Sequence, residues 1–278
     1  GFGTYKENLG EVENAGYQIS AQMRVYSNRE KRASASISAG VAHNSNKLVK
    51  ISDALRSIND EQDEKVGDYN SDRKPVVRFA EGQSMTAIWA VKSLGIDPIN
   101  GQEVFVKKDG SLSYTWDTND QIVAGDSEAK LTGNIGAAME YMGLSLNLSF
   151  TFKYGGQTYN STLLNKIENV DIASVNVDKR VLYDRWNTPG VAAKYKDITN
   201  RSSTYPTTRF VEDVDEFVFS AISVGYDFSE LNFVKRSPID RLRLSFNMND
   251  IGRISTVKQE RGTEYPFART FSFSLSAS

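Results

Sequence analysis

The stretch LTGNIGAAMEYMGLSLNLSFTF, residues 131–152, decides the fold of this chain of 278 residues. Apolar residues such as Leu131 and Ile135 alternate with polar or small ones, and the alternation resumes over 144–152. A period of two places successive side chains on opposite faces of a β-strand. The two alternating segments meet at residues 142–143. The stretch therefore predicts two strands joined by a short turn.

The same period recurs along the chain, which indicates a sheet of about seven strands. A further segment, 216–228, is apolar on both faces in places, so its orientation is open. Each segment approaches the ~9–11 residues that a tilted strand needs to cross a bilayer. One face carries Leu, Phe, Ile and Ala and the other Ser, Asn, Gln, Thr and Arg, as expected between lipid and water. The other clear segments are 17–25, 33–41, 242–248 and 271–277.

The connections alternate between short turns and long loops. Soluble domains seldom carry several such long loops, whereas outer-membrane barrels join short periplasmic turns to long outer loops. We therefore predict an all-β fold, an antiparallel transmembrane β-barrel segment with long extracellular loops, whose first strand runs towards the periplasm. The alternation alone would equally fit a soluble antiparallel sandwich. The short connections are 27–32, 142–143 and 229–240, and the long ones are 44–128, 157–208 and 250–268.

Composition excludes several classes of function. The net charge of −2 gives no basic excess for a phosphate backbone, so we expect no nucleic-acid partner. The chain has no cysteine, and His43 is its one histidine, so thiolate sites and His-based catalytic or multi-His metal sites are excluded. No run of about 18 apolar residues indicates a membrane helix. We predict no enzyme activity, no metal and no cofactor.

Two segments inside the long loops have helical patterns. Residues 52–64 follow Ser52 as a plausible N-cap, and 161–169 form a second candidate. The start of a calcium loop at 68–72 lacks the required Gly at Arg73 and the required acid at Phe79, so we interpret it as a solvated loop. The acidic run 60–64 is interpreted in the same way.

Aromatic residues in the outer loops are the candidate ligand or partner contacts. A sugar ring stacks on an aromatic face, and a partner protein can bury such rings as hot spots. All five lie outside the predicted strand cores, where they could equally pack the loops together or form an interfacial girdle. The candidates are Trp89, Trp116, Trp186, Tyr114 and Tyr205.

An ordered set of motifs resembles the C-terminal part of the barrel in the SusC/RagA family of TonB-dependent outer-membrane receptors. Each motif alone is weak, but they follow the family order along nearly the whole chain. The motifs are YKENLGEVENAGYQI (5–19), VAHNSNKLVKIS (41–52), EGQSMTAIWAVKSLGIDPINGQEVFVKKDGSLSYTWDTND (81–120), FKYGGQTYN (152–160), RVLYDRWNTPG (180–190), TTRFVED (207–213), RLRLSFNMND (241–250) and YPFARTFSFSLSAS (265–278).

The resemblance implies an importer in a Gram-negative, Bacteroidetes-type outer membrane. Such a receptor takes up oligosaccharides or peptides with a SusD-like surface lipoprotein as lid, and TonB with ExbB and ExbD supplies energy. It implies contact with outer-membrane lipid and a dimer of receptor–lipoprotein pairs. The family's plug domain and TonB box have no counterpart in residues 1–278, so we expect a C-terminal barrel portion. The alternatives are a soluble glycan-binding β-sandwich and a non-transporting structural barrel.

Overall fold

The computed structural model describes residues 10–66, 75, 77–174, 176–258 and 269–278. The chain divides into two compact units. Unit 1 comprises Gly1–Ala15, Ser45–Glu128 and Gly156–Asp213, and contains the two longest connections. Unit 2 comprises Gly16–Asn44, Ala129–Gly155 and Val214–Ser278, and contains most of the long strands. Each unit is described by itself below.

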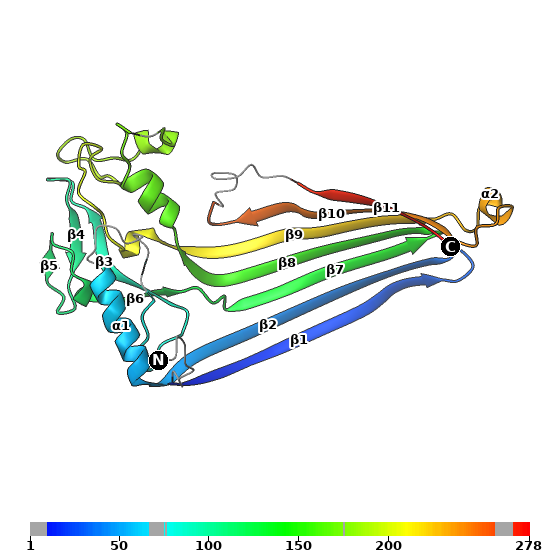
Figure 1. The fold of residues 1–278 in the computed structure, drawn as a ribbon, viewed down its shortest axis with the longest axis horizontal. Helices are drawn as coiled ribbons and strands as arrows, with labels where there is room; N and C mark the ends of the chain where they lie inside the picture. Colours follow the sequence, from blue (N-terminus) through cyan, green and yellow to red (C-terminus); the bar gives the residue numbers. More distant parts are fainter. Residues whose placement is uncertain (1–9, 67–74, 76, 175, 259–268) are drawn as a thin grey trace, which may run out of the picture. The chain divides into compact units, whose positions relative to one another are not determined.

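Seven long strands form one sheet in the order β1-β2-β7-β8-β9-β10-β11, so that each strand lies beside the next long strand of the chain (Figure 1). The four pairs with a described register are antiparallel. This confirms the predicted antiparallel barrel segment, and the sheet is open, with β1 and β11 at its edges. The strands are β1 Gly10–Asn28, β2 Ala33–Ile51, β7 Leu131–Tyr141, β8 Leu144–Tyr159, β9 Val211–Asp227, β10 Leu242–Ser255 and β11 Phe271–Ala277.

The decisive stretch forms the predicted hairpin of β7 and β8. Tyr141 pairs with Leu144, which leaves a connection of two residues. Met142 and Gly143 both have positive φ, 47° and 91°, as the two central residues of a type I′ turn require. Several strands exceed the expected ~9–11 residues; β1 and β2 each have 19.

The register separates the two faces of the sheet as the alternation predicts. Met139 lies opposite Leu146 on the apolar face, and Glu140 lies opposite Ser145 on the polar face. On β11 and over residues 34–40 of β2 the polar face consists of serine, with glycine at position 40. Large apolar side chains on the other face remain exposed in this chain, among them Ile135, Met139, Leu244, Phe271 and Phe273. An apolar face left open in this way fits contact with lipid.

Strand β9 has apolar residues at both even and odd positions because the alternation of its side chains between the two faces shifts by one residue along the strand. Towards its end, Ile222 and Val224 pair with apolar-face residues of β10. A register shift between β9 and β10 follows. Beyond it, Phe217 and Phe219 stack on Phe150, which belongs to the apolar face of β8. The irregularity keeps even-numbered and odd-numbered apolar residues on one face, which resolves the orientation that the sequence left open.

The long connection after β2 carries a second sheet, which the sequence did not predict. Its four strands have the order β5-β4-β3-β6 and belong to unit 1. The helix α1, Asp53–Val66, matches the first predicted helix, and the hydroxyl of Ser52 accepts a hydrogen bond from the Leu55 amide at 3.2 Å as its cap. The four strands are β3 Ala87–Ile96, β4 Glu103–Val106, β5 Leu112–Ser113 and β6 Gln121–Asp126.

A small apolar core holds the second long connection together within unit 1. The second predicted helix is present there as η2, Leu163–Glu168, with π-helical geometry. Buried residues of the core include Leu164, Ile167 and Phe210. The remaining short helices are η1 Thr118–Asp120, η3 Lys179–Leu182 and η4 Thr208–Phe210 in unit 1, and α2 Asn232–Lys235 in unit 2.

Candidate functional site

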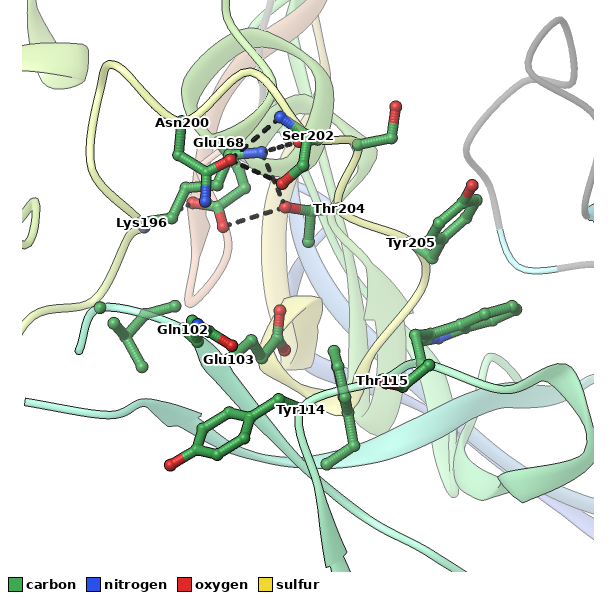
Figure 2. Close-up of a pocket in the computed structure, with 15 residues that line it drawn as sticks. Gln102, Glu103, Tyr114, Thr115, Glu168, Lys196, Asn200, Ser202, Thr204 and Tyr205 are labelled. Carbon is green, nitrogen blue, oxygen red and sulfur yellow. Dashed lines mark hydrogen bonds between the residues drawn. The ribbon is translucent and has the colours of Figure 1, made fainter.

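Three of the five predicted aromatic residues line one pocket of unit 1, about 430 Å³ in volume (Figure 2). The rings of Trp116 and Tyr205 stack with centroids 4.8 Å apart and planes inclined by 24°. The Trp116 indole N–H donates to the carbonyl of Pro206 at 3.1 Å. Tyr114 lines the same pocket, and its hydroxyl donates to Asp97 at 2.6 Å. Protein contacts therefore hold each ring in place before any ligand arrives.

The Tyr114–Asp97 hydrogen bond also shifts the pKa of both groups away from neutrality. It lowers the pKa of the Asp97 carboxyl, with a further contribution from the Ile99 amide, which donates at 2.8 Å. The same bond raises the pKa of the Tyr114 phenol. At neutral pH the carboxylate is charged and the phenol is protonated, so the ring keeps its orientation at the pocket.

Uncharged polar groups complete the lining. The Asn200 side-chain oxygen accepts hydrogen bonds from the amide and the hydroxyl of Ser202, at 3.0 and 2.6 Å. Hydroxyl and amide groups beside aromatic faces can bind the hydroxyls of a sugar or the amides of a peptide backbone. The other such groups are Gln102, Thr115, Ser203 and Thr204.

A buried ion-pair network underlies the pocket. Arg209 of η4 makes a bidentate contact with Glu103 of β4, at 2.8 and 2.7 Å, and a third bond with Glu168 of η2 at 2.8 Å. The three side chains are at most one-tenth exposed. Burial alone would lower the pKa of Arg209, but the two carboxylates outweigh it and raise the pKa above its ordinary value. The network joins three segments that lie far apart in the sequence.

Lys196 is buried beside this network and holds the part of the pocket wall formed by Ser202 and Thr204. Its ammonium donates to the Asn169 side-chain oxygen at 3.0 Å, to the Thr204 hydroxyl at 3.1 Å and to the carbonyl of Ser202. Glu168 in turn accepts from the Thr204 hydroxyl at 3.3 Å. The charges of the lining are therefore paired within the protein, and no pattern in the sequence predicts these pairs.

The other two predicted aromatic residues lie elsewhere in unit 1. Trp89 lies outside the seven long strands, as expected, but it is a residue of β3, because its loop forms a sheet of its own. Trp186 packs against Gly101, where a Cβ would come within 2.6 Å of its ring, and its indole donates to the Pro98 carbonyl at 2.9 Å. Gly101 lines the pocket, so Trp186 supports that part of its wall.

The remaining candidates show no site. His43 lies on β2, where its Nδ1 is 2.6 Å from the Lys130 carbonyl and its ring is close to Tyr17. Among the described residues, no group of three or more acidic or histidine side chains could hold a metal ion. The calcium-loop segment 68–72 lies outside the described residues, as do the side chains at 63 and 64. No helix in the described part of the chain has the length and apolar character to cross a bilayer.

Comparison with curated proteins finds relatives among TonB-dependent receptors. TonB-dependent receptor P3 of Formosa agariphila is 24% identical over 255 residues, which cover 86% of this chain and 24% of the relative. TonB-dependent receptor P39 of the same organism is 21% identical over 290 residues, covering 90% of this chain and 27% of the relative. The chain therefore spans about a quarter of the length of these relatives. No family model matches the chain.

Solved structures of the RagAB peptide transporter share the fold. One has a TM-score of 0.67 at 16% identity, covering 90% of this chain and 27% of the other. The importer in its open-open state has a TM-score of 0.68 at 15% identity, covering 89% of this chain and 26% of the other. The resemblance to SusC/RagA-type TonB-dependent receptors that the motifs indicated is therefore confirmed, and the fold of this chain is that of a segment of such a β-barrel.

Proposed function

We propose that this chain forms part of the wall of a TonB-dependent importer in a Gram-negative, Bacteroidetes-type outer membrane. The observation that carries the proposal is the sequence likeness to TonB-dependent receptors over 86–90% of the chain, joined to the barrel fold. In this role the polar face of the long strands lines the interior and the apolar face contacts lipid. The role is transport, not catalysis.

The cargo is an oligosaccharide or a peptide that meets the pocket of unit 1. The stacked pair Trp116 and Tyr205 offers apolar ring faces, and hydroxyl and amide groups such as Ser202 and Asn200 lie around it. The compared RagAB structures are described as a peptide transporter, which supports a peptide. Stacking on a sugar ring uses the same surface, so a glycan fits the lining equally well.

The partners follow from the same role. A SusD-like lipoprotein closes over the outer loops, and receptor–lipoprotein pairs associate as dimers. Residues 44–128 and 157–208 are the loops that meet this lid or the cargo. TonB, with ExbB and ExbD, drives transport through a plug domain. The name RagAB, in which two components share one importer, supports a paired assembly.

Uptake by intact cells tests this role. We expect a strain that lacks the complete receptor gene to lose growth on one class of oligosaccharide or peptide as sole carbon source. Growth should return with the gene on a plasmid, but not in a strain without TonB. Unchanged growth and unchanged uptake on a broad panel of both classes would instead favour a structural barrel.

The pocket is tested by Trp116→Ala and Tyr205→Ala in the complemented strain. Each removes one face of the stacked pair, and an aromatic stacking contact is worth about 0.5–1.5 kcal/mol beyond its area burial, so we expect uptake at limiting cargo to fall by up to roughly tenfold. Tyr183→Ala is the matched control, because Tyr183 is exposed in unit 1 and does not line the pocket. Equal uptake in all three variants would remove the pocket from the proposal.

A further inference from the structure

Unit 2 has a pocket of its own, about 340 Å³ in volume, among the short turns between the long strands. Figure 1 shows that these turns, together with α2, lie at one end of the sheet. Four arginines and two carboxylates line this pocket, so its lining has a positive excess. The charged residues are Arg29, Arg32, Arg241, Arg243, Glu140 and Asp227.

Two of the arginines already have carboxylate partners. Arg32 pairs with Glu230 at 2.9 Å, and Arg241 pairs with Asp227 at 3.3 Å. Asp227 also accepts hydrogen bonds from the amide and the hydroxyl of Ser229. These contacts stabilise the turns and leave Asp227 little capacity to neutralise another cation.

The other two arginines, Arg29 and Arg243, have no carboxylate partner within the described residues. Arg243 is nevertheless held in place. Its guanidinium lies over Gly225, where an added Cβ would be 3.1 and 3.3 Å from Nη2 and Nε. Nη2 also donates to the Ser145 hydroxyl at 3.1 Å. The side chain therefore lies across neighbouring strands of the polar face, and Gly225 provides the room.

A guanidinium held in this way is prepared to bind an oxyanion. It has five N–H donors in a planar fork, and one hydrogen bond to a neutral hydroxyl leaves most of them free. A carboxylate matches that fork with two parallel hydrogen bonds. An unconstrained arginine side chain loses conformational entropy when it binds a ligand. Arg243 loses less, because its contacts with the neighbouring strands already restrict its side chain.

We propose that this arginine pocket binds the carboxylate of an acidic polypeptide segment that enters the polar face of the sheet at its short-turn end. Charge complementarity identifies the partner, because the lining has four arginines and two carboxylates, and two of the arginines form no ion pair within the described residues. The inference does not depend on the cargo or on the pocket of unit 1. The arginine pocket of unit 2 binds through charge, whereas the pocket of unit 1 offers aromatic rings for stacking.

Carbodiimide coupling in the intact, detergent-purified receptor tests the proposal. Arg243→Lys keeps the positive charge and introduces an amine, which the reagent joins to any carboxylate in direct contact. The reaction is run on the receptor alone and with a synthetic hexaglutamate peptide, and mass spectrometry identifies the joined residues. We expect the amine at position 243 of the receptor alone to couple to an Asp or Glu outside the pocket lining, and excess hexaglutamate to lower that coupling because the peptide is joined to position 243 instead.

Arg236→Lys is the matched control, because Arg236 is an exposed arginine in the same turn region that does not line the pocket. Folding of both variants is verified by the heat-dependent shift of a barrel on a gel. Coupling at 236 as strong as at 243, coupling at 243 only to Glu140 or Asp227, or no coupling at 243 would each overturn the proposal. Growth on cargo is measured separately, so a failure here is distinct from a failure of import.

Discussion

Arg209 shows how much of the pocket of unit 1 depends on a single side chain. Its guanidinium joins a strand, a π-helix and a short 3₁₀ helix through two carboxylates that have almost no exposure. Buried ion pairs contribute little net stability when complete, but removing one partner leaves the other charge without compensation. The arginine is therefore expected to specify the arrangement of these segments.

The first prediction concerns Arg209→Met. Glu103 and Glu168 would remain buried without their cation, so we expect unit 1 to lose about 3–5 kcal/mol of stability. Hydrogen–deuterium exchange of η2 in the intact receptor measures the loss, which corresponds to at least a hundredfold faster exchange. The exchange rate of η2 in Arg209→Lys should lie between the rates in the wild type and in Arg209→Met. Arg201→Met, at an exposed loop arginine, should leave the exchange rate of η2 unchanged. Unaltered exchange in Arg209→Met would mean that the network is dispensable.

Single residues were only partly predictable from the sequence. Trp116, Tyr114 and Tyr205 were singled out as aromatic loop residues, and the structure brings these three together. Glu103 and Lys196 gave no signal, because isolated charges in a long polar loop look the same whether they are solvated or buried. Only the fold of the loop, which places residues more than 100 positions apart in contact, distinguishes the two cases.

At the level of elements, the turn between β7 and β8 offers a direct test of local backbone chemistry. Gly143 has a φ of +91°, and a Cβ there would lie 2.8 Å from the Asp227 carbonyl oxygen. Gly143→Ala combines backbone strain with this close approach, so we expect a loss of about 1–3 kcal/mol. The temperature of the heat-dependent gel shift reports it.

Gly252→Ala is the matched control for that turn. Gly252 also lies in the seven-stranded sheet, but it has no positive φ and no heavy atom within 4 Å of an added Cβ. If both alanine variants lowered the temperature of the gel shift equally, the loss would reflect replacing any glycine in the sheet and not the geometry of this turn.

Elements with clean alternation were predictable because a strand with one apolar and one polar face has a sequence period of two. The six clear segments all lie within strands, and the turn at 142–143 has its expected length. Strand β9 was ambiguous because a register irregularity interrupts the period, and periodicity cannot reveal which residue slips. The small sheet of unit 1 escaped prediction because its strands have only 2 to 10 residues, too few for a period of two to be distinguished.

For the whole molecule, the two faces of the long sheet should meet different solvents. Leu146 and Ser145 are neighbours on β8 that point to opposite faces, and the chain has no cysteine to interfere with labelling. We expect a spin label at 146 in the intact receptor in lipid to collide more with oxygen than with a water-soluble nickel chelate, and a label at 145 to show the reverse. Equal accessibility at both positions would refute the membrane orientation of the sheet.

The serine-rich polar face has a consequence for movement along it. Ser34, Ser36 and Ser38 succeed one another on β2, and Ser272, Ser274 and Ser276 do so on β11. Such short hydroxyl side chains have little rotamer freedom to lose, and each exchanges one modest hydrogen bond for another of similar strength. A solute that moves along this face therefore meets only weak binding positions of similar free energy. Its dwell time is set by the few charged residues and not by the serines.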